Sequence, residues 1–200
     1  LLMQLARTRF TTSSNPRTLA FKAHEIVLRT FGLDSAQAAR SSLQVAGIFF
    51  DTGNTDDALT WAQQARTQVS VHFGTSSFDH AQAQELIARA ALRKKRLTEA
   101  TVAMGSAITG LERYYLPNSR ELAEAYALMS DILVAREDWA EAFRFARKAS
   151  FIASTTSRQS FMRYHRGQTL SQDMGRRMHE QALRTAIEAA KEVQDPRPVM

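Results

Sequence analysis

Few side chains in this sequence have the types and spacing that catalysis or metal binding needs. The five histidines form no zinc pattern, and His179-Glu180 lacks the second histidine one turn later that a metalloprotease helix carries. These histidines are His24, His72, His80, His165 and His179. The chain has no cysteine, which excludes disulfides, thiolate metal ligands and cysteine nucleophiles. We therefore predict no metal site and no cofactor.

Two glycines and three serines resemble parts of catalytic motifs. Gly105 and Gly110 have the spacing of a phosphate-binding loop, but Leu111-Glu112 follows where lysine and a hydroxyl residue must meet phosphate and magnesium. Each of the three serines directly precedes a helical pattern, where its hydroxyl can accept a free backbone N–H group. They are Ser35, Ser77 and Ser119. The sequence therefore predicts helix caps and no catalytic residue.

The most prominent surface feature is a basic patch of four adjacent cations, Arg93, Lys94, Lys95 and Arg96. One interpretation is that these cations stabilise the negative end of a helix dipole. The other is a contact with RNA phosphate, an acidic protein or lipid headgroups. A formal net charge of +6 favours anionic partners in general. A second basic group, the arginines of residues 158–177, carries aromatic residues between its cations, but no RNA-binding motif accompanies it.

A larger pattern organises the chain, because residues 30–35, 72–77 and 114–119 resemble one another at a spacing of 42 residues. Small residues recur at the same spacing, as in Ala58, Ala100 and Ala142. Such a fixed spacing indicates a stacked helical repeat in which small side chains let helices approach closely. We expect antiparallel pairs, with a first helix at about 36–52, 78–95 and 119–136 and a second at about 56–72, 97–114 and 139–154.

These repeats resemble tetratricopeptide repeats of the long, 42-residue kind found in kinesin light chains. The resemblance is carried by Val45-Ala46, Phe49, Ala58 and Ala65 and by the residues 42 and 84 positions later. It covers roughly residues 16–154. It implies an all-α solenoid of antiparallel helix hairpins, an architecture that leaves long faces exposed for adaptor or subunit work.

The resemblance also implies a partner-binding groove lined by the first helix of each repeat. The family's groove positions fall on Arg40, Leu43, Phe50, Asp51, Gln82, Glu85, Arg89, Leu92, Arg93, Glu124 and Asp131. The signs of these charges are mixed, which suits a protein segment better than a uniformly negative polymer. Phe50 and Leu92 offer apolar contact to such a segment.

The N-terminal residues suggest a targeting segment. Residues 16–31 align with 58–73 and predict the second helix of a repeat whose first helix is degenerate. Residues 1–24 contain four cations and many hydroxyl residues, and the first acid is Glu25. This resembles a mitochondrial targeting segment or its remnant, so we predict a mitochondrial location, with the cytoplasm as the alternative.

The repeat register fails towards the C-terminus, where a polar helical stretch at about 157–193 is expected to cap the last hairpin. The sequence thus predicts residues 1–15 as a degenerate helix or targeting remnant, 16–154 as repeats, and 155–200 as a helical cap and tail. No apolar run approaches the roughly 18 to 20 residues that span a bilayer.

Together these features predict a non-enzymatic protein–protein interaction scaffold that is a subunit or assembly factor of a larger complex. The alternative is an RNA-contacting subunit of a ribonucleoprotein particle. The expected partners are other protein subunits, with RNA or another anionic surface at the basic patch in the alternative. An enzymatic role would require a catalytic domain outside this sequence.

Overall fold

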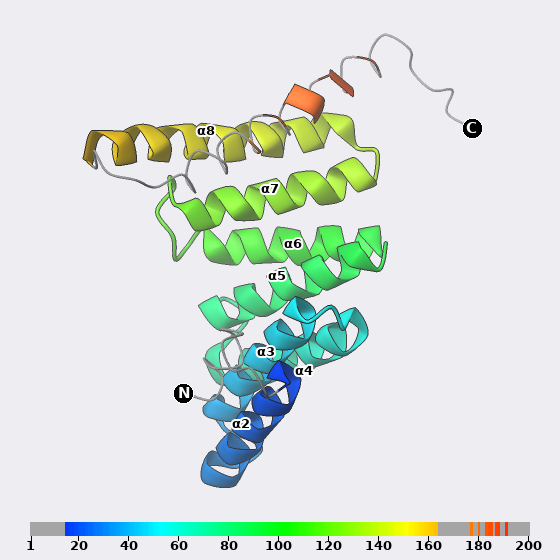
Figure 1. The fold of residues 1–200 in the computed structure, drawn as a ribbon, viewed down its shortest axis with the longest axis vertical. Coiled ribbons are helices and arrows are strands. Elements are labelled where there is room, and N and C mark those ends of the chain that lie inside the picture. Colours follow the sequence, from blue (N-terminus) through cyan, green and yellow to red (C-terminus); the bar gives the residue numbers. More distant parts are fainter. Residues whose placement is uncertain are drawn as a thin grey trace. The chain divides into compact units, whose positions relative to one another are not determined.

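The structure, a computed structural model, describes residues 15–163 and, further on, residues 177, 180, 183–185, 187, 188 and 191. The described residues are helical without any strand, which confirms the predicted all-α class (Figure 1). The helices are α2 (Pro16–Phe31), α3 (Ala36–Asp51), α4 (Thr55–Phe73), α5 (Phe78–Arg93), α6 (Leu97–Leu111), α7 (Arg120–Ala135) and α8 (Trp139–Arg163). The chain divides into two compact units, Leu1–Gly110 and Leu111–Met200.

The helices follow the predicted 42-residue register. The first helices α3, α5 and α7 begin at residues 36, 78 and 120, and the second helices α4, α6 and α8 begin at 55, 97 and 139. The hydroxyls of Ser35, Ser77 and Ser119 accept the backbone N–H three residues later, at 3.0, 3.2 and 3.3 Å. The prediction that these serines cap helices is therefore confirmed.

The turn inside each hairpin places one residue in the left-handed region. Gly53, Lys95 and Glu137 occupy the same repeat position, with φ of 83°, 57° and 63°. In the middle turn, the Lys95 N–H bonds to the Leu92 carbonyl and the Arg96 N–H bonds to the Ala91 carbonyl, both at 2.9 Å. This is the Schellman arrangement that satisfies carbonyls at a helix end. Glycine adopts it freely, whereas a residue with a Cβ is strained there.

The turns between hairpins differ along the chain. Gly32 and Gly74 follow α2 and α4 with φ of 86° and 82° and ψ of 163° and 162°, a conformation that essentially only glycine adopts. The equivalent residue in the third repeat is Leu116. Helix α6 ends at Leu111, earlier than the predicted 114, and the chain reaches α7 through residues 112–119. The leucine therefore requires a different connection at this repeat.

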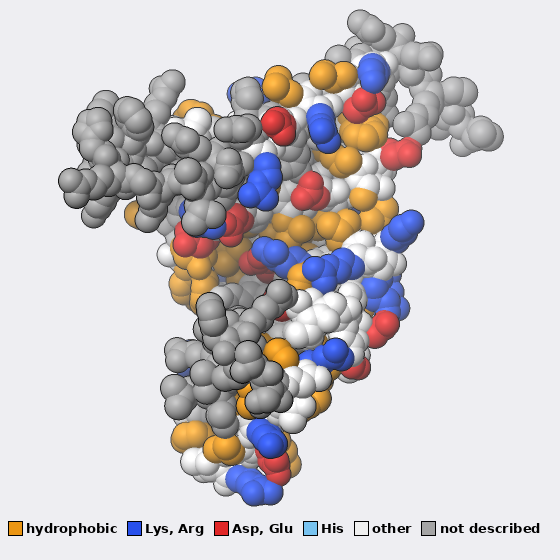
Figure 2. All heavy atoms as spheres, viewed as in Figure 1, with side chains coloured by type: hydrophobic (Ala, Val, Ile, Leu, Met, Phe, Trp, Pro, Cys, Tyr) orange, Lys and Arg blue, Asp and Glu red, His pale blue; other side chains and the backbone are white. Residues whose placement is uncertain are grey.

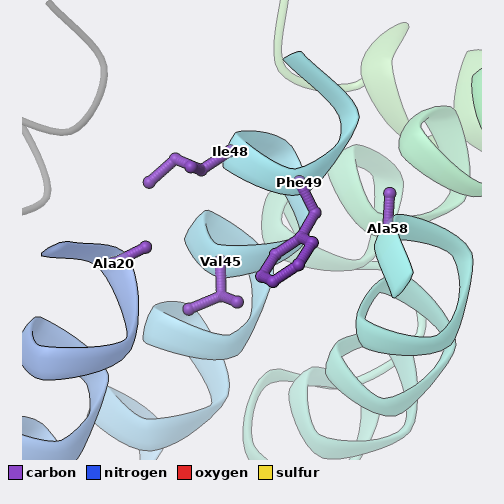
Figure 3. Packing of buried hydrophobic residues seen from close by; sticks show 5 residues of the cluster. All are labelled: Ala20, Val45, Ile48, Phe49 and Ala58. Atoms are coloured by element: carbon purple, nitrogen blue, oxygen red, sulfur yellow. The ribbon is translucent and has the colours of Figure 1, made fainter. Parts of the chain in front are cut away.

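The core of the first unit lies where α2, α3 and α4 meet. Ala20, Val45, Ile48, Phe49 and Ala58 form one buried cluster (Figure 3). Alanines of α2 and α4 face the larger side chains of α3, so the three helices pack closely.

The approach of α6 to α5 is equally close. A Cβ added to Gly110 of α6 would lie 2.6 Å from the Cβ of Ala81 in α5. No real Cβ tolerates that distance, so this position requires glycine.

The second unit is built from α7 and α8. Helix α8 buries Ala142, Ala146, Ala149 and Ile152. The buried hydroxyl of Ser130 in α7 donates to the Ala142 carbonyl at 2.9 Å and ties the two helices together. A small hydroxyl residue at this repeat position thus satisfies its own hydrogen bond across the hairpin.

Helix α8 continues to Arg163, beyond the predicted end at 154, because no glycine or proline occurs between residue 139 and Gly167. The division predicted between 154 and 155 therefore lies inside a helix. Most of the predicted capping stretch lies outside the described residues. Where it is described it is helical, and Thr185 is only 2% exposed, so this part packs against its own unit.

Candidate partner-binding surfaces

A pocket of about 330 Å³ lies between α3 and α5 in the first unit. The residues that line it are Arg40, Leu43, Gln44, Gly47, Phe50, Asp51, Asp79, Gln82, Glu85, Leu86 and Arg89. Seven of the predicted groove residues are among them, so the structure brings these seven together. Leu92 and Arg93 lie in the last turn of α5, outside the lining, and Glu124 and Asp131 belong to α7 of the other unit.

An inter-repeat ion pair closes one end of the pocket. The Arg40 guanidinium of α3 donates to both carboxylate oxygens of Asp79 in α5, at 3.0 to 3.2 Å. This hydrogen bonding raises the pKa of Arg40 above its ordinary value. The same guanidinium lies 4.4 Å from the Phe73 ring centroid. Because the Arg40 head is held by a carboxylate and a ring, it forms a fixed edge of the pocket.

A second arginine is held within α5, where Arg89 donates to Glu85 at 2.6 and 3.0 Å. The exposed carboxylate of Asp51 differs from these pairs, since it has no partner among the described residues. Gly47 adds no side chain in the middle of α3, which leaves room for the hollow. The pocket therefore combines two compensated arginines with one uncompensated acid.

Arg93 contacts the rim of this surface. Its guanidinium lies 3.6 Å from the Phe50 ring centroid and donates to the Phe50 carbonyl at 3.0 Å. One face of Phe50 is thus covered by a cation of the next repeat. The Phe50 carbonyl near the end of α3, which also accepts the Gly53 N–H at 3.1 Å, gains a second donor. Leu92 beside it is half-buried.

The basic patch of residues 93–96 is mostly engaged in contacts within the unit. Lys94 forms an ion pair with Asp56 of α4, and Arg96 lies 3.6 Å from Glu99. With Arg93 on Phe50, only Lys95, at the strained turn position, lacks a partner in the described part of the chain. The geometry supports the interpretation in which these cations serve a helix end and the neighbouring repeat. For the second basic group, the side chains of residues 156–163 and all of 164–176 lie outside the described residues.

Four residues line the pocket without having been predicted as groove positions: Gln44, Gly47, Asp79 and Leu86. Gln44 and Leu86 occupy one repeat position, directly after the predicted Leu43 and Glu85. Gly47 is equivalent to Arg89. The sequence signal that could have identified Gly47 is a glycine in the middle of an amphipathic helix. Glycine destabilises such a helix, so its presence there indicates a position that needs a small residue. For Asp79 the sequence indicates only an acid in the first turn of a helix, so it gives no sign that this residue lines a pocket.

Asp131 lines a different pocket, of about 360 Å³, within the second unit. Val134, Trp139 and residues of the 177–188 segment lie around it. Burial raises the pKa of the Asp131 carboxyl. The last predicted groove residue, Glu124, is paired with Arg120 at 2.8 Å on the exposed side of α7.

Two of the described histidines, His24 and His80, are buried within the fold. His24 is buried, with its Nδ1 2.7 Å from the Ser41 hydroxyl and its ring edge-on to Trp61. His80 is likewise buried, and burial lowers the pKa of both.

Among the described residues no group of three or more acid or histidine side chains gathers as metal ligands would. No described helix is long and apolar enough to cross a membrane.

Comparison with known proteins gives likeness in structure only. No protein-family model matches the sequence, and no curated protein does either. The TPR-like repeats of a Podosopora anserina protein described as a kinesin light chain superpose with a TM-score of 0.74 at 13% identity, over 96% of this chain and 87% of that chain. The MamA protein superposes with a TM-score of 0.55 at 18% identity, over 100% of this chain and 96% of that chain.

BtubC from P. vanneervenii gives a TM-score of 0.61 at 15% identity, over 77% of this chain and 59% of that chain. At identities this low, the likeness shows the fold alone. The chain therefore has the tetratricopeptide-like solenoid fold that its 42-residue spacing predicted.

Proposed function

We propose that this chain is a non-enzymatic interaction scaffold that holds an extended segment of a partner protein in the α3–α5 pocket. The observation that carries the proposal is the composition of that pocket: the apolar side chains of Leu43 and Leu86, two arginines fixed by carboxylates, and an uncompensated Asp51. Such a surface is preorganised, because its charged edges are held before any partner arrives.

Each part of the lining suits a part of a peptide. The side chains of Leu43 and Leu86 offer apolar contact, the amides of Gln44 and Gln82 can bond a peptide backbone, and Asp51 can pair with a basic residue. A volume of about 330 Å³ suits one or two side chains rather than a folded domain. The expected ligand is therefore an extended segment with a basic residue beside an apolar one.

Asp51 gives an independent argument. It is the last residue of α3, where a negative charge is unfavourable beside the negative end of the helix dipole. Natural sequences tolerate such local costs most often at functional positions. A carboxylate that does not stabilise its own helix is thus a reasonable contact for a partner.

A larger complex is the setting we propose for this scaffold, as subunit or assembly factor. The tetratricopeptide-like fold supports protein partners, since stacked repeats expose long faces. RNA binding through the basic patch is the weaker candidate, because three of its four cations already contact groups of the same unit.

Quantitative pull-down from native extract tests the pocket. Gly47→Leu fills the hollow, and Asp51→Lys reverses its uncompensated charge. We expect the partners recovered with the wild-type chain to fall about tenfold with either variant, since loss of a charged contact or a filled pocket is worth roughly 1.4 kcal/mol or more. Asp34→Lys is the matched control, because Asp34 is also an exposed acid without a partner among the described residues but lies outside the pocket.

Circular dichroism and urea unfolding check that the variants fold. Asp51→Lys should be at least as stable as the wild type, because lysine suits the negative end of a helix. Recovery of the same partners at the same yield with both pocket variants would contradict the proposal.

A further inference from the structure

Helix α8 carries the largest excess of cations over acids among the described helices. Among its 25 residues are five lysines or arginines and a single acid, Glu141, whereas α5 has two acids and two arginines. Both acids of α5 are paired, Asp79 with Arg40 of α3 and Glu85 with Arg89. On α8 the arrangement is different, because Arg147 and Lys148 have no acid three or four residues away along the helix.

Five of its residues form one surface, which we call the α8 stripe: Phe143, Arg144, Arg147, Lys148 and Phe151. They line a hollow of about 400 Å³. Their spacing of three and four residues places them on one face of the helix, over a length of about 12 Å. This face lies away from the buried Ala142, Ala146, Ala149 and Ile152, which face the core.

The three cations of the α8 stripe differ in their surroundings. Arg144 pairs with Glu141. Arg147 is exposed and has no partner among the described residues. The Lys148 ammonium lies 5.1 Å from the Tyr126 ring centroid and 5.3 Å from that of Phe145, which holds it over two aromatic rings without neutralising it. Two positive charges therefore remain uncompensated beside the hollow.

The stripe also exposes apolar surface between these charges. Phe151 is 64% exposed, in contrast to the buried Ile152 and Ala153 that follow it. Phe143 and Phe151 are two helical turns apart, and Arg147 lies between them. An exposed phenylalanine next to uncompensated cations is typical of an interaction surface, where aromatic residues and arginine are enriched.

Charge complementarity selects an acidic partner. We propose that the α8 stripe docks an acidic protein segment that inserts a large apolar side chain between Phe143 and Phe151 and places carboxylates on Arg147 and Lys148. A single-stranded nucleic acid fits less well, because two free cations give a salt slope of only about 1.4 in log K per log unit of salt.

The proposal is tested with the full chain and a fluorescent peptide of pattern Glu-Glu-Leu-Phe-Glu-Glu, by anisotropy at low and physiological salt. We expect binding that is lost when the peptide phenylalanine is replaced by serine. Arg147→Glu should weaken binding about tenfold, the effect of roughly one charged contact. Lys22→Glu, at an exposed lysine without a partner in the described residues, should leave it unchanged.

Phe151→Ser tests the apolar part, with Val102→Ser as its control, because Val102 is 69% exposed on α6. We expect Phe151→Ser to weaken peptide binding and Val102→Ser to leave it unchanged. Equal losses with Arg147→Glu and Lys22→Glu would show bulk charge attraction and overturn the proposal. The proposal would also be overturned if the chain did not bind the peptide, or if it bound a labelled uridine 15-mer more tightly than the peptide. Gly47→Leu is expected to leave peptide binding unchanged, which separates this proposal from the α3–α5 pocket.

Discussion

The α3–α5 pocket and the α8 stripe use the same helical repeat but have opposite charge balances. In the pocket, Arg40 and Arg89 are each held by a carboxylate, and the uncompensated group is an acid, Asp51. On the α8 stripe, the uncompensated groups are two cations, Arg147 and Lys148. Alanines at fixed positions set the fold in both regions, while partner chemistry is set by the exposed residues between them. One scaffold can thus present two surfaces of opposite preference.

The largest effect is expected from breaking the packing beneath only one of these surfaces. Ala88 of α5 is fully buried, so Ala88→Phe should overpack the first unit and cost about 1 to 3 kcal/mol or more. The urea midpoint of unfolding measures this loss. Gln64→Phe is the control, because it adds the same ring at an exposed position of α4.

The acidic peptide should still bind the Ala88→Phe chain, since the α8 stripe lies in the other unit. An unchanged urea midpoint would mean that Ala88 does not lie at a close helix crossing. If Ala88→Phe abolished peptide binding at the α8 stripe as well as partner binding in the α3–α5 pocket, the two surfaces would not be independent of each other.

A pH titration is expected to separate the two units further. Burial lowers the pKa of His24 and His80 in the first unit, so the folded state favours their neutral forms. The unfolded chain binds protons at each histidine as pH falls below about 6.5, whereas the folded chain does so only at lower pH. The stability that these neutral histidines contribute is therefore fully present above about pH 6.5 and is lost as pH falls towards the lowered pKa values.

Urea unfolding at pH 7.5 and 5.5 measures this loss. The described part of the second unit contains no histidine, so its unfolding should change less over the same range. His24→Gln keeps a polar partner for Ser41 and should flatten the dependence. A wild-type chain equally stable at both pH values would contradict the lowered pKa values.

The smallest effect concerns the strained turns. Lys95 in the first unit and Glu137 in the second both adopt positive φ, where Gly53 stands in the first repeat. Lys95→Gly should therefore raise the free energy of unfolding by about 0.5 to 1 kcal/mol. Lys95→Ala removes the same charge and keeps the strain, so equal stability of the two variants would show that strain is not the cause. Glu137→Gly should repeat the gain.

Much of this fold follows from sequence spacing. The 42-residue register, the capping serines and the alanine positions are local features, and each was confirmed by a helix start or a buried contact. The repeat register fails after residue 154, but a change in register does not end a helix. Since no helix breaker occurs before Gly167, α8 continues past its predicted end. Helix α6 also ends earlier than predicted, and Leu116 in the connection that follows stands where two earlier repeats have glycine.

The surfaces were less predictable. The sequence showed four adjacent cations at 93–96, but their partners lie in the preceding repeat: Phe50 and Asp56, which only the packing of hairpins brings near. Conversely, the sequence shows that no acid lies three or four residues from Arg147, but only the structure shows that no described acid of another helix pairs with it. Charge pairing between repeats depends on three-dimensional contacts, which spacing alone does not contain. The predicted mitochondrial location depends on residues 1–24, most of which lie outside the described part, and it stays a prediction.

Mixed charge is also visible over the surface drawn in Figure 2, where acidic and basic side chains are interspersed among hydrophobic ones. A scaffold of this kind is best tested by locating its partner directly. A photo-crosslinking residue placed at Gln44 probes the pocket from its exposed lining, and one at the exposed Gln64 of α4 is the control. We expect that Gln44 yields a crosslink to a single segment of a partner protein in native extract, that this crosslink disappears with Asp51→Lys, and that Gln64 yields none. Equal crosslinking at both positions, or a crosslink at Gln44 to RNA alone, would contradict the proposed scaffold function.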